Sequence, residues 1–280
     1  MNSEVKTWLI TGVSGGLGRA LALEAARNGH IVIGTLRKEE QLLAFNNLVA
    51  GKTFGLQLDV NEAEGIEEKI AKLVAEHKNI DVLVNNAGYG LFGAIEEVSM
   101  EEARQQMETN FFGALAMTKA VLPYMRKQRS GSIIQISSMA GFRSNPGMGL
   151  YNASKFALEG FSEALALEVE NLNIKVTIVE PGPFRTNWAG GSSARAATVI
   201  EDYADTAGAR IATVTGYSGQ QPGDPVKAAR AIVSVVEAEN PPLRLALGTV
   251  AMEAIRTKLE SVKKNLSDWE ELSRDTDFDD

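Results

Sequence analysis

The chain of 280 residues contains no cysteine, only two histidines and no long apolar run. Without cysteine there is no disulfide, no thiolate metal ligand and no cysteine nucleophile. No stretch reaches the roughly 20 apolar residues that a membrane-spanning helix needs. Residues 1–6 also lack the basic and apolar segments of a secretion signal. The sequence therefore predicts a cytoplasmic protein without a membrane segment and without a metal site.

Positive charge is also scarce. The chain has 28 Lys and Arg against 36 Asp and Glu, which gives a formal net charge of -8. An acidic surface repels the phosphate backbone of nucleic acids, so we expect no nucleic-acid partner. The two histidines, His30 and His77, each follow a helical stretch near a turn. We expect each of them to be a cation at a helix C-terminus or an ordinary surface residue.

Short apolar runs alternate with amphipathic stretches along the chain. The runs are continuous, which is typical of strands in a sheet that is covered on both faces. We expect strands at residues 6–11, 31–36, 53–58, 81–85, 132–137, 175–180 and 243–247. Helical spacing occupies residues 17–28, 39–47, 62–77, 100–127, 152–171 and 225–239. This exchange predicts an α/β fold, a single doubly wound Rossmann domain with a seven-stranded parallel sheet and helices on both faces.

One interval interrupts the alternation. Residues 184–223 contain no strand-like run, and a short helical pattern appears only at 197–213. A long insertion without sheet partners is often a substrate lid, although an ordinary surface excursion has the same pattern. A polar helix at 249–266 and an acidic tail follow the last expected strand. We expect one domain over residues 1–280, with a lid at 184–223 and a C-terminal helix and tail at 249–280.

The first expected strand ends in a glycine-rich turn, and a helix follows at once. The turn reads Thr11-Gly12-Val13-Ser14-Gly15-Gly16-Leu17-Gly18. Glycine lets the backbone turn tightly and approach a pyrophosphate, and the helix N-terminus offers free N–H groups with a partial positive charge. The spacing is not Gly-x-Gly-x-x-Gly, and any tight strand-to-helix turn favours glycine. The position after the first strand of a β-α-β unit nevertheless favours a nucleotide site.

The second expected strand ends in Thr35-Leu36-Arg37-Lys38. The ribose of a dinucleotide is recognised about 20 residues beyond the glycine turn. An acidic residue there would accept a hydrogen bond from the 2′-hydroxyl, whereas Arg37 can hold a 2′-phosphate through bidentate contacts. Glu39 and Glu40 are nearby, but Glu is favoured in the first turn of any helix. We expect NADP(H) as the preferred cofactor, with NAD(H) as the second choice.

Tyr151 is the only one of five tyrosines with a lysine, Lys155, four residues later. On a helix these two residues share a face, so the ammonium group can lie beside the phenol. A tyrosine pKa of ~10 is too high for a base at neutral pH, and lowering it by ~3 units needs roughly 4 kcal/mol of phenolate stabilisation. Lys155 and an oxidised nicotinamide can supply this, and in reduction the phenol would donate its proton to the forming alkoxide. Ser138, at the end of an earlier strand, can hold the substrate oxygen beside the phenol or simply end that strand.

With three further blocks, these residues resemble the short-chain dehydrogenase/reductase family. The further blocks are Asn85-Asn86-Ala87-Gly88, Asn110 in the helix expected at 100–127, and Pro181-Gly182-Pro183-Phe184-Arg185-Thr186. The resemblance covers residues 7–248, nearly the whole chain. The segment Leu245-Ala246-Leu247-Gly248 and the helical tail are similar to the subgroup of 17-beta-hydroxysteroid dehydrogenases and retinol dehydrogenases.

The resemblance implies a role for each matching position. The catalytic residues would be Asn110, Ser138, Tyr151 and Lys155, with Asn110 acting on Lys155 through a kinked helix and a water molecule. The cofactor would be bound by Gly12, Ser14, Gly15, Gly16, Leu17, Gly18, Arg37, Asp59, Val60, Asn86, Ala87, Gly88, Asn110, Tyr151, Lys155, Pro181, Gly182, Phe184 and Thr186. The substrate would contact Ser138, Met139, Phe142, Met148, Tyr151 and Trp188.

These residues predict an NADP(H)-dependent oxidoreductase that interconverts a ketone or aldehyde and an alcohol on a mostly apolar small molecule. One alternative is an epimerase or dehydratase with the same Tyr-Lys pair, although such relatives are longer and carry Gly-x-x-Gly-x-x-Gly. The other is a regulator that senses NADP without turnover, although such proteins typically lack the tyrosine or the lysine. The resemblance also implies a homodimer or homotetramer that pairs through the helices at 100–127 and 156–169.

Overall fold

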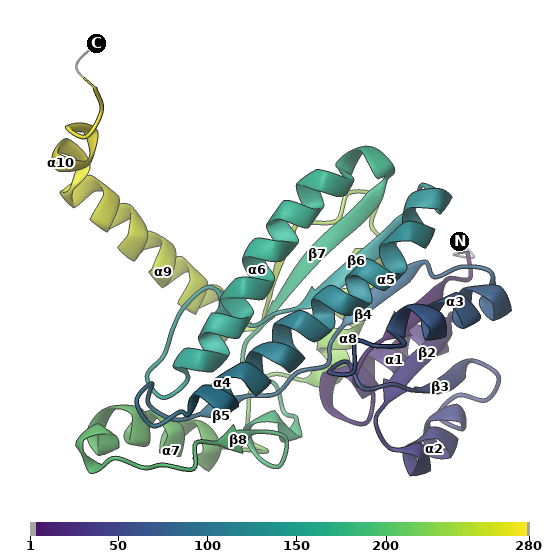
Figure 1. Ribbon diagram of the computed structural model, residues 1–280, viewed down its shortest axis with the longest axis horizontal. Helices are drawn as coiled ribbons and strands as arrows, with labels where there is room; N and C mark the ends of the chain where they lie inside the picture. Colours follow the sequence, from purple (N-terminus) through teal and green to yellow (C-terminus); the bar gives the residue numbers. More distant parts are fainter. Residues whose placement is uncertain (1–3, 279–280) are drawn as a thin grey trace.

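Seven parallel strands form the central sheet of the computed structural model, which describes residues 4–278 (Figure 1). Their order across the sheet is β3 (Thr53–Gln57), β2 (Ile31–Leu36), β1 (Thr7–Ile10), β4 (Val82–Asn85), β6 (Gly131–Ile136), β7 (Ile174–Pro181) and β9 (Arg244–Leu247). All seven expected strands are present, and the predicted Rossmann-like fold is confirmed. Residues 1–3 of the expected domain and residues 279–280 of the expected acidic tail lie outside the described residues.

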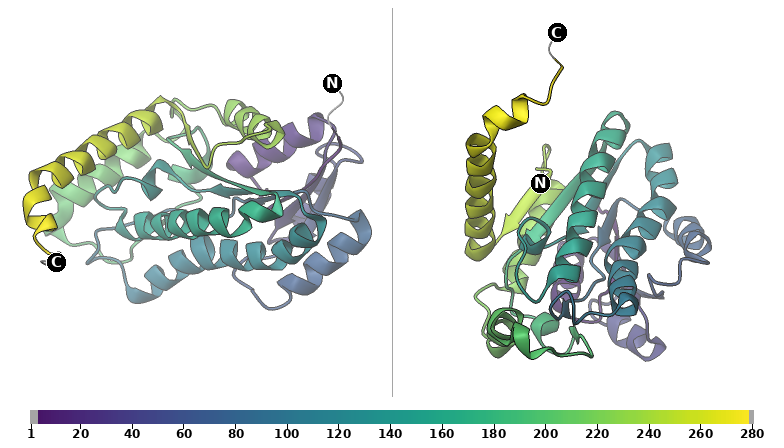
Figure 2. Two further views of the ribbon diagram at one scale, coloured as in Figure 1. Left: turned by 90° about the horizontal axis from the view of Figure 1, so that it is seen from above. Right: turned by 60° about the vertical axis from the view of Figure 1, so that its left-hand side comes forward.

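Helices cover both faces of this sheet (Figure 2). On one face lie α1 (Gly16–Arg27), α2 (Leu42–Asn46) and α8 (Pro225–Glu237), and on the other lie α3 (Ile66–His77), α5 (Gly113–Gln128) and α6 (Gly149–Val169). Trp8 points into the first core and its neighbour Leu9 into the second, and both are fully buried. Burial of successive side chains on opposite faces explains the continuous apolar runs of the sequence.

The long helix expected at 100–127 contains an irregular turn. It consists of α4 (Met100–Met107), one π-helical turn (Glu108–Phe112) and α5. A π turn inserts one extra residue into a helix and is frequent at functional sites. Asn110 lies in this turn and is buried. The kinked helix that the resemblance implied is therefore present at Asn110.

The lid segment, residues 184–223, has more regular structure than its sequence predicts. It contains β8 (Ala194–Arg195), a π turn (Ala204–Gly208) and α7 (Ala209–Gly216). β8 pairs in parallel with β5 (Leu91–Phe92), and its first N–H donates to the carbonyl of Gly90 at 2.8 Å. The expectation that this segment has no strand was wrong, because a two-residue strand leaves no periodicity in a sequence.

His30 lies in the core, so its expected surface position was wrong. Its side chain is 1% exposed, and its ring stacks on Trp8 with 5.8 Å between the ring centroids. Nδ1 accepts a hydrogen bond from the N–H of Lys6, and burial lowers the pKa of the imidazole. The residue lies directly before β2, where its ring can stack on Trp8 of the neighbouring strand β1. His77, in contrast, ends α3 as a partly exposed residue.

The last long helix, α9 (Thr249–Asp268), leaves the sheet edge after β9 and stands apart from the body over much of its length (Figure 1). Of its residues only Ala251 and Ala254 are buried, and a short helix, α10 (Glu270–Arg274), follows. Within residues 4–278, we find no helix whose length and apolar character would let it cross a membrane.

Candidate active site

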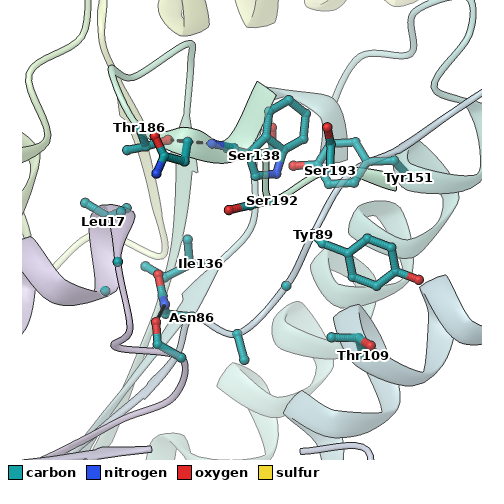
Figure 3. A pocket seen from close by; sticks show the side chains of 18 of the residues that line it. Leu17, Asn86, Tyr89, Thr109, Ile136, Ser138, Tyr151, Thr186, Ser192 and Ser193 are labelled. Carbon is teal, nitrogen blue, oxygen red and sulfur yellow. Dashed lines mark hydrogen bonds between the residues drawn. The ribbon is translucent and has the colours of Figure 1, made fainter. Parts of the chain in front are cut away.

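A cleft of about 1030 Å³ opens at the carboxyl ends of the parallel strands. This is the edge at which open α/β sheets bind their ligands. Figure 3 shows Leu17 and Asn86 on one side of the cleft, and Tyr89 and Tyr151 on the other. All predicted cofactor-binding residues except Asn110 line this cleft. The structure thus brings together residues from seven separate segments that the sequence singled out.

The glycine turn forms a cradle at the start of α1. Gly12 and Gly16 have φ angles of 71° and 56°, a left-handed conformation that favours glycine. A Cβ on Gly18 would lie 2.4 Å from Asn86 Nδ2 and 2.6 Å from the carbonyl oxygen of Gly12. No described side chain caps the N-terminus of α1, so its first N–H groups are free to bind an anion. The residues present therefore fit a pyrophosphate.

Hydrogen bonds tie this cradle to its neighbours. The Thr11 hydroxyl accepts from the N–H groups of Asn86 and Ala87, both at 2.9 Å. Asn86 Nδ2 donates to the carbonyls of Thr11 at 2.8 Å and Gly12 at 3.0 Å. The Gly12 N–H donates to the hydroxyl of Thr35 at 3.1 Å. The ends of β1, β2 and β4 are thereby held as one rigid rim of the cleft.

Arg37 lies on this rim where β2 ends. It lines the cleft, its side chain is exposed, and no carboxylate of residues 4–278 lies within 4.0 Å of its guanidinium. Lys38 beside it pairs with Glu40 at 3.8 Å, and Asp59 lines the cleft at the end of β3. The guanidinium of Arg37 is thus available to a phosphate bound in the cleft.

Tyr151, Lys155 and Ser138 meet at the wall of the cleft. Tyr151 and Lys155 lie in the first turns of α6 and are 4% and 5% exposed, and Ser138 follows β6. The Ser138 side chain lies near the Tyr151 phenol and influences its pKa, and the Ser138 hydroxyl accepts from the N–H of Ala140 at 3.1 Å. Lys155 Nζ donates to the carbonyl of Ile136 at 2.8 Å. A substrate oxygen at this wall would therefore face a phenol and a hydroxyl.

Burial controls the protonation of both residues on α6. It raises the pKa of Tyr151 to about 12, and the Ser138 side chain opposes this only partly. It lowers the pKa of Lys155 to about 8, which the negative charge of Glu159 opposes. The protein groups alone do not lower the tyrosine pKa as expected, because desolvation outweighs the opposing effect of the Ser138 side chain. At neutral pH the phenol is neutral, and this is the form that donates a proton.

The substrate side of the cleft lies around Tyr151. Met139, Met148 and Trp188 line it as predicted. The centroids of the Trp188 and Tyr151 rings lie 5.1 Å apart. Phe142 requires a correction, because it does not line the cleft. The guanidinium carbon of Arg244 lies over the Phe142 ring, 5.4 Å from the ring centroid. The short helix Met139–Gly141 turns the chain away from the cleft before Phe142 is reached.

A family model described as short chain dehydrogenase matches residues 6–197. The chain belongs to the short-chain dehydrogenase family. The family and its named relatives make it an oxidoreductase, as predicted.

Three relatives illustrate the range of this family. A 3-ketodihydrosphingosine reductase of Bacteroides thetaiotaomicron is 43% identical, over 86% of this chain and 87% of its own length. The oxidoreductase BOA17 of Botryotinia fuckeliana is 39% identical, over 96% of this chain and 98% of its own. Human retinol dehydrogenase 8 is 36% identical, over 87% and 82% of the two chains.

Solved structures agree with the fold. A short-chain dehydrogenase from Streptomyces avermitilis superposes with a TM-score of 0.92 at 43% identity, over 99% of this chain and 100% of that one. An alcohol dehydrogenase from Thermococcus sibiricus, solved with 5-hydroxy-NADP, superposes with a TM-score of 0.72 at 26% identity, over 89% and 98% of the two chains.

In this short-chain dehydrogenase Asn110 does not line the cleft. It supports the cleft wall through hydrogen bonds to the backbone of Tyr89. Its Oδ1 accepts from the N–H of Tyr89 and its Nδ2 donates to the Tyr89 carbonyl, both at 3.0 Å. A Cβ on Gly88 would lie 3.0 Å from Asn110 Oδ1 and 3.6 Å from Lys155 Nζ. Asn110 and Lys155 therefore approach Gly88 together, which explains why this position is glycine.

An acidic cluster behind Lys155 was missed by the sequence reasoning. Glu159 lies one turn beyond Lys155 on α6, is 4% exposed and contacts Arg244 of β9. Arg244 also pairs with Glu180 at 2.5 Å and Glu163 at 2.8 Å. Burial raises the pKa of Glu159 to about 6. The spacing of Tyr151, Lys155 and Glu159, four residues apart each time, was a signal that could have revealed it.

The sequence reasoning also missed a polar part of the cleft. The polar residues that line it and were not predicted include Asn145, Asn187, Ser192, Ser193, Arg210, Tyr217 and Gln221. All of these except Asn145 belong to the lid segment. A segment without regular periodicity gives no indication of which side chains face inward, so no sequence signal was available for them.

Proposed function

We propose that the protein is an NADP(H)-dependent oxidoreductase that interconverts a carbonyl group and an alcohol on a small molecule. The observation that carries this proposal is that the buried Tyr151 and Lys155 and the half-buried Ser138 line the same cleft as the glycine cradle. Two relatives support the cofactor class. The Thermococcus sibiricus alcohol dehydrogenase was solved with 5-hydroxy-NADP, and a serine dehydrogenase at 30% identity was solved with NADP+.

The bound nicotinamide cofactor would donate or accept the hydride. Ser138 and Tyr151 would hold the substrate oxygen by two hydrogen bonds, with the lid segment covering it. As the alkoxide forms, the phenol of Tyr151 transfers its proton to that oxygen. The charge of Lys155 stabilises the phenolate that is left, and the Ile136 carbonyl holds the ammonium group in place. Asn110 fixes the backbone beside Lys155 through Tyr89.

A panel of aldehydes and ketones tests the reaction class. With NADPH present, the absorbance of the reduced nicotinamide should fall for part of an apolar panel. Tight NADPH binding without turnover of any member would instead favour the NADP-sensing regulator. A product that shows epimerisation or loss of water, without net cofactor consumption, would favour the epimerase or dehydratase alternative.

Arg37→Asp should reverse the cofactor preference. In the wild type the guanidinium binds the 2′-phosphate, so NADPH should bind about 10- to 100-fold more tightly than NADH. An aspartate would repel that phosphate and accept a hydrogen bond from the 2′-hydroxyl of NADH. Fluorescence titration with both reduced cofactors measures the order. Arg27→Asp makes the same charge change on exposed α1 surface outside the cleft and should not reverse it. Equal affinities in the wild type would refute the preference.

The rate of carbonyl reduction should fall as the pH rises through about 8, where Lys155 loses its proton. The neutral amine no longer stabilises the phenolate. Burial is the main cause of the lowered lysine pKa, and the Glu159 charge opposes it. Glu159→Gln removes that opposing charge, so the midpoint of the pH profile should move to lower pH. Glu159→Asp keeps a carboxylate, so its midpoint should stay close to that of the wild type. The pH profile of kcat with saturating NADPH measures this, and a midpoint that moves upward would contradict the assignment.

We also propose that the protein is a homodimer or homotetramer located in the cytoplasm. The α4–α5 segment and α6 expose apolar side chains, including Phe112 at 46%, Phe156 at 43% and Leu167 at 77%. Exposed apolar patches of this kind support self-association about a two-fold axis. Sedimentation equilibrium should give the mass of two or four chains, and the mass of one chain would contradict the proposal.

A further inference from the structure

A second hollow of about 460 Å³ adjoins the substrate side of the cleft. This hollow lies between the loop that follows β6 and the base of α9. Met139, Asn145 and Arg210 line both the cleft and the hollow. The hollow therefore neighbours the space in which a substrate would bind at Tyr151.

Two arginines border the hollow without a carboxylate partner. Within the described part of the chain, no Asp or Glu oxygen lies within 4.0 Å of the Arg143 or Arg210 guanidinium. The Nε of Arg210 is buried and has no hydrogen-bond partner there. Glu253 also lines the hollow, but it pairs with Arg256 at 3.0 Å. A buried donor destabilises a protein unless a ligand or a water molecule accepts its proton.

The two arginines are held close to one another by the packing of their segments. Arg210 lies on α7, and Arg143 lies on the loop before α6. Gly147 of that loop packs against α7, where a Cβ would lie 2.8 Å from Ile211 Cγ1. Met148 and Ile211 share a small buried core. This side of the hollow is thus formed by two segments that pack against each other, α7 and the loop before α6.

The chemistry along the cleft changes from apolar to cationic. Around Tyr151 the lining includes the apolar Met148, Trp188 and Val214 beside uncharged serines, whereas Arg143, Arg210 and Asn145 line the hollow. A chain with a formal net charge of -8 repels small anions in general. Unpaired arginines beside the substrate cleft therefore indicate selective binding of an anion, for which guanidinium is well suited.

We infer that the substrate is an amphipathic carbonyl compound, with an apolar body and an anionic carboxylate or phosphate group distant from the carbonyl. Arg210 and Arg143 bind the anionic group while the carbonyl lies at Ser138 and Tyr151. This inference rests on the proposed function and names the substrate class for the same site. It adds an anionic group to the mostly apolar substrate expected from the sequence.

Matched substrate pairs test this inference. We would compare ω-oxo carboxylates of increasing chain length with their methyl esters, and ω-oxo alkyl phosphates with the corresponding ω-hydroxy aldehydes. At the best chain length the anionic member should have a kcat/KM about 10- to 100-fold higher than its neutral partner, mostly through a lower KM. The two series distinguish a carboxylate from a phosphate. Equal kcat/KM within every pair would overturn the inference.

Arg210→Gln should lower the ratio of anionic to neutral kcat/KM toward one, and Arg210→Lys should keep part of it. The control is Arg195→Gln, because Arg195 is an exposed arginine of the same lid segment that donates to Thr215 and lines neither the cleft nor the hollow. This control should leave the ratio as in the wild type. An Arg210→Gln variant that loses activity equally on both members would show that Arg210 only supports the lid, which would overturn the inference.

A binding measurement separates this inference from the proposed function. A saturated fatty acid and its methyl ester carry no ketone or aldehyde, so their binding does not depend on turnover. Tryptophan fluorescence should report binding, since Trp188 lies against Tyr151. With NADPH present the acid should bind more tightly than the ester, and Arg210→Gln should remove the difference. Equal binding of acid and ester would overturn the inference even where carbonyl reduction is observed.

Discussion

Tyr151→Phe should abolish carbonyl reduction while the protein stays folded and binds NADPH nearly as before. The substitution keeps the ring, whose centroid lies 5.1 Å from that of Trp188, and removes only the phenol oxygen near Ser138. Loss of a general acid typically lowers kcat by about 10²- to 10⁴-fold. Single-turnover reduction at saturating NADPH measures the chemical step, and fluorescence titration measures the cofactor affinity.

Tyr203→Phe is the matched control for this variant. Tyr203 belongs to the lid segment, and its hydroxyl donates to Glu96 at 2.6 Å on the surface. It does not line the cleft, so the control should reduce carbonyl compounds at about the wild-type rate. A Tyr151→Phe variant with wild-type kcat would show that another group donates the proton. A variant that loses NADPH binding as well would show that the phenol mainly supports the cofactor site.

Gly18→Ala should nearly eliminate NADPH binding. The added Cβ would meet Asn86 Nδ2 at 2.4 Å and the Gly12 carbonyl oxygen at 2.6 Å, and both atoms belong to the rigid rim of the cleft. Forcing a methyl group into a packed site costs about 1–3 kcal/mol. Here the displaced atoms form the phosphate cradle, so we expect the dissociation constant for NADPH to rise by at least about 10-fold.

Gly15→Ala is the comparison for this variant. A Cβ on Gly15 would meet nothing within 4 Å, and its φ of -168° is extended backbone that any residue adopts. Its effect on NADPH binding should therefore be much smaller than that of Gly18→Ala. Thermal unfolding without cofactor distinguishes a damaged cradle from a damaged fold. Equal NADPH affinity for Gly18→Ala and the wild type would refute the assigned cradle.

The fold could be predicted from the sequence because its strands are covered on both faces. Burial of neighbours such as Trp8 and Leu9 on opposite faces produces continuous apolar runs that are hard to mistake. Local geometry was harder to predict. The helix expected from residue 62 begins only at Ile66, because Gly65 adopts a left-handed φ of 84° directly before it. The burial of His30 depends on stacking with Trp8, which is a tertiary contact without local sequence signal.

The candidate site likewise contains residues that could be predicted from the sequence and residues that could not. Residues at strand ends and helix starts, such as Gly18, Ser138 and Tyr151, were predictable because motif spacing fixes their place at the cleft. Residues of the lid segment were not, because Arg210 reaches the cleft through the packing of α7 on the loop before α6. Phe142 shows the opposite error. Its apolar side chain suggested a substrate contact, whereas it packs against the Arg244 guanidinium.

Isotope transfer from the cofactor tests the central claim most directly. NADPH with deuterium in place of both hydrogens of the reactive nicotinamide carbon would be incubated with the best carbonyl substrate, and the alcohol would be analysed by mass spectrometry. If hydride transfer occurs at the Tyr151 wall of the cleft, the alcohol should carry one deuterium on the former carbonyl carbon, and Tyr151→Phe should form almost none of it. An alcohol without deuterium, or the same labelled yield from Tyr151→Phe, would contradict the account.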